Sequence, residues 1–107
     1  MVVNIYNPKQ YWEDRFRKYG IESPLATGKL GLTPEQNEQM YAEANARLKS
    51  IINTNIGIGS VDSMIDIGCG SGRYINTLLH AFPKANYTGL DITDIWFDAL
   101  RTTYSAQ

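Results

Sequence analysis

The stretch SMIDIGCGSGRYINTLLHAFPKANYTGLDIT, residues 63–93, decides the fold. It opens with a short, mostly apolar run closed by glycines, which is typical of a parallel strand covered on both faces. Residues 73–82 then carry apolar side chains at helical spacing and end at a proline. A second strand is indicated at residues 86–91, and Thr93 suits the cap of a last helix up to Tyr104. These elements predict a βαβα unit with two neighbouring parallel strands whose carboxyl ends share one edge.

Two helices are expected before this unit. The first begins with the Asn-Pro pair at residues 7–8 and ends at Gly20, with aromatic side chains at helical spacing. A loop at residues 21–32 leads to a longer helix at residues 33–55, which begins with a capping-box pattern. A glycine-punctuated link at residues 56–60 follows. The apolar stripe of the long helix comprises Met40, Tyr41, Ala44, Leu48, Ile51 and Ile52.

The segment between the first strand and its helix, DIGCGSG at residues 66–72, has glycine at every second position from Gly68. Glycine lets a ligand approach the backbone closely, and free amide N–H groups at a helix start favour a carboxylate or phosphate. Asp91 follows the second strand, nineteen residues after Gly72 (91 minus 72). A carboxylate there can accept two hydrogen bonds from a ribose diol. The turn and the acid together predict a nucleoside-shaped site across the strand ends.

The sequences MIDIGCGSGRY and YTGLDIT resemble the first and second motifs of class I S-adenosylmethionine-dependent methyltransferases. The resemblance implies a truncated Rossmann-like α/β fold. Residues 1–60 would be an N-terminal helical lid segment, and residues 61–107 the first βαβα half of the cofactor-binding domain. It implies an enzyme with S-adenosylmethionine as cofactor and in-line methyl transfer to an acceptor of unknown class. It names no catalytic residue.

The same resemblance implies a set of cofactor contacts. Backbone of the glycine turn would meet the methionine part, Asp66 would face its ammonium group, and Asp91 would hold both ribose hydroxyls. Ile92 would lie against the adenine. The alternatives are that Asp66 caps local amides and that Ile92 is part of the core. The implied contact residues are Asp66, Gly68, Cys69, Gly70, Gly72, Asp91 and Ile92.

Three other interpretations stay open. The aromatic stripe of Trp12, Phe16 and Tyr19 either closes over the cofactor as a lid or is simply core. An NAD-dependent oxidoreductase fragment fits less well, because Arg73 stands where the GxGxxG fingerprint needs its third glycine. A non-catalytic nucleoside-binding or interaction module is the alternative from another class. Two strands with unpaired edges also predict self-association.

Composition sets wider limits on function. The 107 residues suffice for one domain, and a net charge of −1 without basic runs does not imply nucleic-acid binding. One cysteine and one histidine predict neither a disulfide nor a metal site. Apolar runs are far shorter than the roughly 20 residues of a membrane span, and no secretion signal is recognisable. A soluble protein of the cytoplasm is therefore expected.

Overall fold

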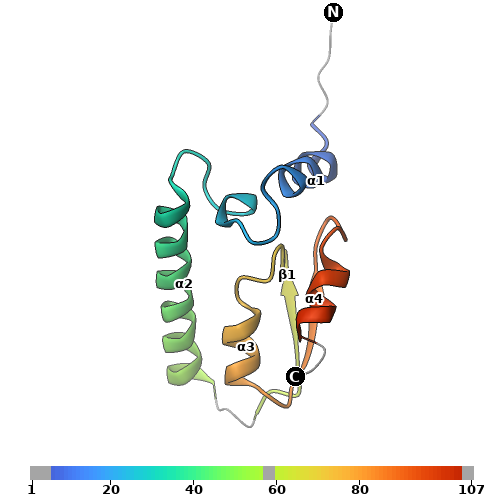
Figure 1. Cartoon of the computed structure of the whole chain (residues 1–107). Helices are drawn as coiled ribbons and strands as arrows, with labels where there is room; N and C mark the ends of the chain where they lie inside the picture. The colour runs from blue at the N-terminus through green and yellow to red at the C-terminus, as the bar shows by residue number, and fades with distance from the viewer. Residues whose placement is uncertain (1–5, 57–59, 105–107) are drawn as a thin grey trace, which may run out of the picture.

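The computed structural model describes residues 6–56 and 60–104. These ranges form a small α/β fold with four α-helices, one short 3₁₀ helix and one two-stranded sheet (Figure 1). Most of the predicted link at residues 56–60 lies outside the described residues. In chain order the elements are α1 (Pro8–Tyr19), η1 (Pro24–Ala26), α2 (Pro34–Asn55), β1 (Ser63–Ile67), α3 (Ile75–Ala81), β2 (Asn86–Leu90) and α4 (Phe97–Tyr104).

Both N-terminal helices begin where the sequence predicts. The side chain of Asn7 accepts a hydrogen bond from the amide of Gln10 at 3.1 Å. At the start of α2, the Gln36 amide donates to the Thr33 hydroxyl at 3.1 Å and the Thr33 amide donates to Gln36 Oε1 at 2.9 Å. This reciprocal capping box satisfies two amides that a helix start would otherwise leave without partners. The predicted end of the long helix is also confirmed, at Asn55.

The two strands pair in parallel, as predicted. Ser63 lies opposite Asn86, and Ile67 lies opposite Leu90. The connecting helix α3 is shorter than the predicted 73–82. Gly72 has a φ of +78°, which is not helical, and Tyr74 at the helix start has no side-chain cap, so regular helix begins only at Ile75.

The last helix begins later than predicted, because Thr93 caps a turn and not α4. The Thr93 hydroxyl accepts from the amide of Ile95 at 3.4 Å and donates to Glu13 of α1 at 3.1 Å. The amide of Phe97 then bonds the carbonyl of Asp94 at 3.0 Å. The bond to α1 fixes Thr93 in a buried position, so the chain makes a turn before the helix starts.

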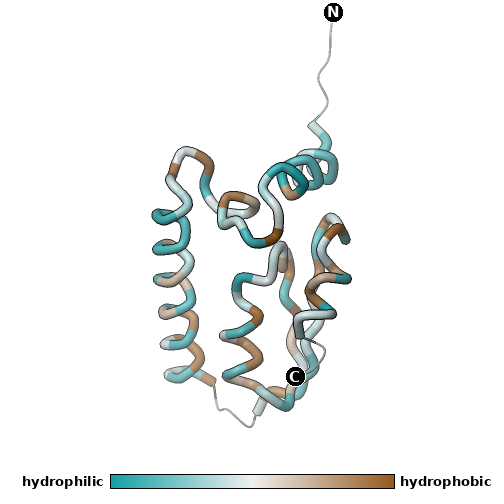
Figure 2. Tube along the Cα trace, viewed as in Figure 1, coloured by the Kyte–Doolittle hydropathy of each residue, from teal (hydrophilic) through white to brown (hydrophobic). Residues whose placement is uncertain are grey.

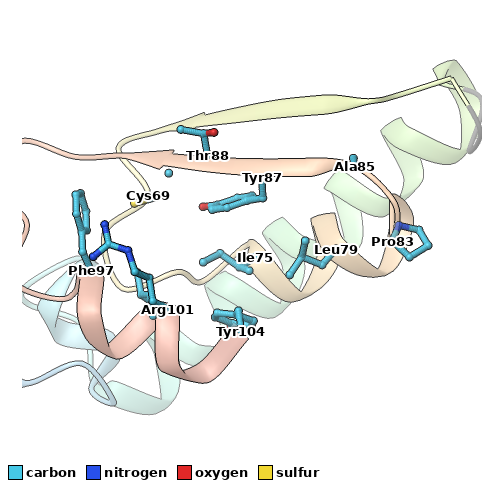
Figure 3. A pocket seen from close by; sticks show the side chains of 12 residues that line it. Cys69, Ile75, Leu79, Pro83, Ala85, Tyr87, Thr88, Phe97, Arg101 and Tyr104 are labelled. Carbon is cyan, nitrogen blue, oxygen red and sulfur yellow. The ribbon is translucent and has the colours of Figure 1, made fainter. Parts of the chain in front are cut away.

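The expectation that helices cover both faces of the sheet is wrong for the described residues. Figure 3 shows α3 and α4 on the same side of the two strands. On the opposite face Ile65 is 66% exposed and Ile67 is 82% exposed, and Leu90 beside them is about half exposed. One face of strand β1, which has the sequence SMIDI, is therefore not covered by the described residues. We call Ile65, Ile67 and Leu90 the bare sheet face.

The main core cluster joins the two ends of the described chain. The rings of Phe16 in α1 and Trp96 before α4 stack with centroids 4.0 Å apart and planes 13° apart. Phe16 is only 3% exposed, and Ala26 of η1 completes the cluster. This packing places α1 and the 21–32 loop at the end of the sheet where the glycine turn lies (Figure 1).

The long helix α2 contacts η1 and α3, but its predicted apolar stripe is only partly covered. Ile52 is buried, whereas Met40 and Ile51 are exposed. Figure 2 shows that the most hydrophobic positions of this helix gather at its C-terminal end. The buried side chain near the helix start is instead polar. Asn37 is fully buried and bonds the backbone of the preceding loop. Within the described residues, no helix combines the length and apolar character needed to cross a membrane.

Candidate functional site

The glycine turn, residues 68–72, is fastened to the end of the neighbouring strand. The amides of Gly68 and Cys69 both donate to the carbonyl of Leu90, at 2.6 and 3.0 Å. Gly68, Gly70 and Gly72 have φ values of +76°, +52° and +78°, a region that glycine adopts readily and other residues rarely. The alternating glycines therefore let the chain reverse tightly across both strand ends.

Asp91 lies against this turn. Its Oδ2 accepts a hydrogen bond from the amide of Gly70 at 2.9 Å, and its Oδ1 accepts from the amide of Thr93 at 3.2 Å. Parallel strands end at one edge of a sheet, so an acid just after β2 meets a turn just after β1. The structure thus brings together the two features that the sequence pairs, and each carboxylate oxygen keeps lone pairs for a further donor.

Asp66 has a partner inside the fold. Its Oδ2 accepts a hydrogen bond from the Tyr87 hydroxyl at 2.9 Å, beneath the paired strands. Burial, and then this bond to a carboxylate, raise the pKa of the Tyr87 phenol well above its usual value of 10.0. The alternative that Asp66 caps local amides finds no support among the described residues, because its carboxylate accepts from a tyrosine of the next strand. Sequence reasoning missed Tyr87.

Cys69 and Ile92 differ sharply in exposure. Cys69 is buried, and burial raises the pKa of its thiol, with the charges of Asp91 and Asp66 raising it further. A thiol kept neutral in this way is a poor nucleophile. Ile92 is 50% exposed, so the alternative that it is simple core is wrong. It is an apolar side chain directly after the site carboxylate, open to solvent.

One polar atom of the turn lacks a partner. The hydroxyl oxygen of Ser71 is buried, and no hydrogen bond to it exists within the described residues. At the start of the same turn, a Cβ atom added to Gly68 would meet nothing within 4 Å, so the backbone there is open. A buried hydroxyl without a hydrogen-bond partner is the kind of feature that a bound molecule or water accounts for.

The 21–32 loop packs on the turn through Thr27. Its methyl carbon lies 3.0 Å from the position that a Cβ on Gly70 would occupy. The Thr27 hydroxyl is 2.6 Å from the hydroxyl of Tyr41 in α2. A Cβ atom at position 70 would therefore require the Thr27 side chain to shift. Sequence reasoning missed Thr27, since nothing in the loop marks it as a contact.

Arg73 connects the same turn to the N-terminal half. Its guanidinium donates to Glu38 Oε1 at 2.8 Å and to the backbone carbonyl of Glu22 at 3.2 Å, and it lies over the ring of Tyr41. The sequence singles out Arg73 only as too bulky for the NAD fingerprint. In the structure its side chain links the segment after the glycine turn to the 21–32 loop and to α2.

The three aromatic residues considered as a lid differ in how deeply they are buried. Phe16 is buried against Trp96, so at this position the stripe is core. Trp12 and Tyr19 are partly buried against the same cluster. Helix α1 also reaches the site through Glu13, which accepts the hydrogen bond from Thr93 two residues after Asp91. This helix is thus fixed beside the strand ends.

Comparisons with known proteins add no assignment: no protein-family model, curated protein or solved structure matches this chain significantly.

Proposed function

We propose that this chain carries the S-adenosylmethionine-binding part of a Rossmann-like methyltransferase. The observation that carries the proposal is the 2.9 Å hydrogen bond between the Gly70 amide and Asp91 Oδ2. It joins the glycine turn and the acid at one edge of a parallel strand pair, where α/β folds bind nucleosides. Residues 61–107 would form the first half of the cofactor-binding domain, and residues 1–60 would cover it.

The residues of the site fit such a nucleoside cofactor. Gly68 has open space beside its Cα, the buried Ser71 hydroxyl lacks a partner, and Asp91 is only half-buried and has lone pairs left. Asp91 would hold the ribose hydroxyls, and the exposed Ile92 side chain would lie against the base.

The amides of Gly68 and Cys69 already donate hydrogen bonds to the carbonyl of Leu90. The turn would therefore meet the methionine part through glycine Cα atoms and through the Ser71 hydroxyl. This refines the role that the family resemblance gives to the backbone of the turn. Asp66, whose Oδ2 accepts from Tyr87, would contribute its negative charge toward the ammonium group at a distance.

The proposed reaction is in-line methyl transfer. When bound, S-adenosylmethionine supplies an electrophilic methyl group with a neutral leaving group, so the protein mainly has to align the acceptor. The neutral Cys69 thiol does not compete as a nucleophile, because its pKa is raised. Glu13 and Thr93 hold α1 against the site edge, where the helix would help to exclude water.

Isothermal titration calorimetry with S-adenosylhomocysteine tests the proposal. We expect one-to-one binding, which Asp91→Ala weakens by about 1–3 kcal/mol through loss of charge-assisted hydrogen bonds. Asp94→Ala is the matched control, because it removes an exposed carboxylate three residues away and should leave the affinity unchanged. Asp91→Asn keeps an acceptor for the Gly70 amide, so it separates ligand contact from support of the turn.

The outcomes distinguish the candidate functions. Equal affinities of the Asp91→Ala and Asp94→Ala variants would overturn the ribose assignment. Binding without transfer of labelled methyl groups to any acceptor in a cell extract would favour a non-catalytic nucleoside-binding module. Binding of NADH, seen as a change in its fluorescence, would favour the oxidoreductase alternative.

A further inference from the structure

A cavity lies on the α3 and α4 side of the sheet, and Cys69 of the glycine turn is one of the residues that line it. It is a groove of about 820 Å³ between α3, β2 and α4, beneath the sheet in Figure 3. Its volume falls in the range of about 300–1,000 Å³ that small-molecule sites occupy. Apolar side chains from all three elements line it, among them Ile75, Leu79, Tyr87, Phe97, Leu100 and Tyr104.

The apolar side chains of α4 face this groove without being buried. Phe97, Leu100 and Tyr104 recur at helical spacing and line the cavity, yet no residue of α4 is buried. The helix thus keeps an apolar wall in partial contact with solvent. Covering such a wall removes apolar surface from water, which is the main driving force for binding an apolar ligand.

The sheet side of the groove carries a ring held in one orientation. Figure 3 shows Tyr87 lying beneath β2, on the side of α3 and α4. Its hydroxyl is fixed by the 2.9 Å bond to Asp66. Gly89 makes room for the ring, because a Cβ there would stand only 3.2 Å from two of its atoms. A fixed aromatic ring that lines a cavity favours a planar ligand that stacks on it.

Arg101 gives the groove its charge. It is the single charged side chain among the described residues that line the cavity, and Figure 3 shows it beside Phe97, between α4 and β2. It donates to Asp98 at 3.1 Å, but both side chains are largely exposed, at 71% and 100%. An exposed pair of this kind contributes little, so its guanidinium is available to a carboxylate, which it can bind through two parallel bonds.

We propose that this groove binds a planar aromatic carboxylate, with the ring system against Tyr87 and the acid group on Arg101. The proposal does not depend on the methyltransferase assignment. Cys69 of the glycine turn lines the groove and Asp66 bonds Tyr87, but Arg101 is not among the residues proposed to hold the nucleoside.

Heteronuclear NMR titration of the full chain tests the proposal, with naphthoate as the probe and naphthalenemethanol as its neutral counterpart. We expect saturable one-to-one shifts of the Tyr87, Gly89 and Leu100 amides. Naphthoate should bind about tenfold more tightly than the alcohol, as one charged contact implies. Arg101→Gln should abolish that preference while leaving the weaker binding of the alcohol. Arg47→Gln, an equal charge change on exposed α2, should preserve it.

Two results would overturn the proposal. One is equal affinity for acid and alcohol in the unchanged protein, which would remove the role of Arg101. The other is a set of shifts centred on Ile65 and Ile67, or shifts that never saturate, which would mean that the probe only adheres to the bare sheet face.

Discussion

Replacing Asn37 by alanine should loosen the loop that packs on the glycine turn. Asn37 is fully buried at the start of α2. Its Oδ1 accepts from the Lys29 amide at 2.7 Å, and its Nδ2 donates to the carbonyls of Lys29 at 3.0 Å and Thr33 at 3.2 Å. One side chain thus replaces the backbone partners that this irregular segment lacks. Thr27, which contacts Gly70, belongs to the same loop.

The expected size of the effect follows from these three bonds. At about 0.5–1.5 kcal/mol each, they sum to about 1.5–4.5 kcal/mol. Lys29 itself is exposed, so water can reach its backbone groups once the side chain of Asn37 is gone. We therefore expect Asn37→Ala to lower the free energy of unfolding by about 2–3 kcal/mol.

Urea unfolding followed by far-ultraviolet circular dichroism measures this difference. The midpoint should fall while the slope of free energy against urea stays constant, since little surface changes. Asn55→Ala is the control, because Asn55 lies in the same helix, is exposed, and donates to the carbonyl of Ile51. It should cost less than about 0.5 kcal/mol.

Equal costs for the Asn37→Ala and Asn55→Ala variants would refute the reasoning. A second comparison sharpens the test. A Cβ on Gly28 would overlap Asn37 Oδ1 and the carbonyl of Pro24, so Gly28→Ala should also destabilise the loop. Because part of that overlap is with Asn37 itself, the double variant should cost less than the sum of the single ones.

Three further predictions concern the core and the turn. Phe16→Ala should lower the free energy of unfolding by about 3–5 kcal/mol, through the cavity it opens beside Trp96, and calorimetric melting measures this loss. Gly72→Ala should be more destabilising than Gly68→Ala in urea unfolding. Both glycines have a positive φ, but only at Gly72 would the new Cβ stand within 3 Å of the Ile75 and Leu100 side chains. Equal losses of unfolding free energy in the two variants would contradict this. Above about pH 9 the protein should lose stability, because the raised pKa of Cys69 means that the unfolded state releases the thiol proton first; Cys69→Ala should reduce this loss in urea titrations at pH 8 and pH 10.

The sequence predicted the elements whose signals are local. The Asn-Pro start of α1, the capping box of α2 and the apolar run of β1 each depend on neighbouring residues, and all are confirmed. The start of α4 was not predictable in this way. It depends on Thr93, whose hydroxyl bonds Glu13 eighty residues away, and no short-range pattern encodes that contact.

In the candidate site, too, the sequence predicts some contacts and not others. Asp91 beside Gly70 follows from parallel pairing, so the motif spacing predicts it. Its hydrogen bond to Thr93, the Tyr87 partner of Asp66 and the docking of Thr27 depend on side-chain packing that the sequence does not display. The bare face of β1 was also missed, because an apolar run is compatible with one covered face or two.

The stacking of Phe16 on Trp96 has a consequence for the order of folding. The two rings are eighty positions apart, as are Glu13 and Thr93. During synthesis, helix α1 therefore leaves the ribosome long before the residues that cover its aromatic side have been made. Contacts of such long sequence separation slow folding and leave apolar groups open to chaperones meanwhile. Helix α1 should accordingly gain protection from hydrogen exchange only in the last step of refolding.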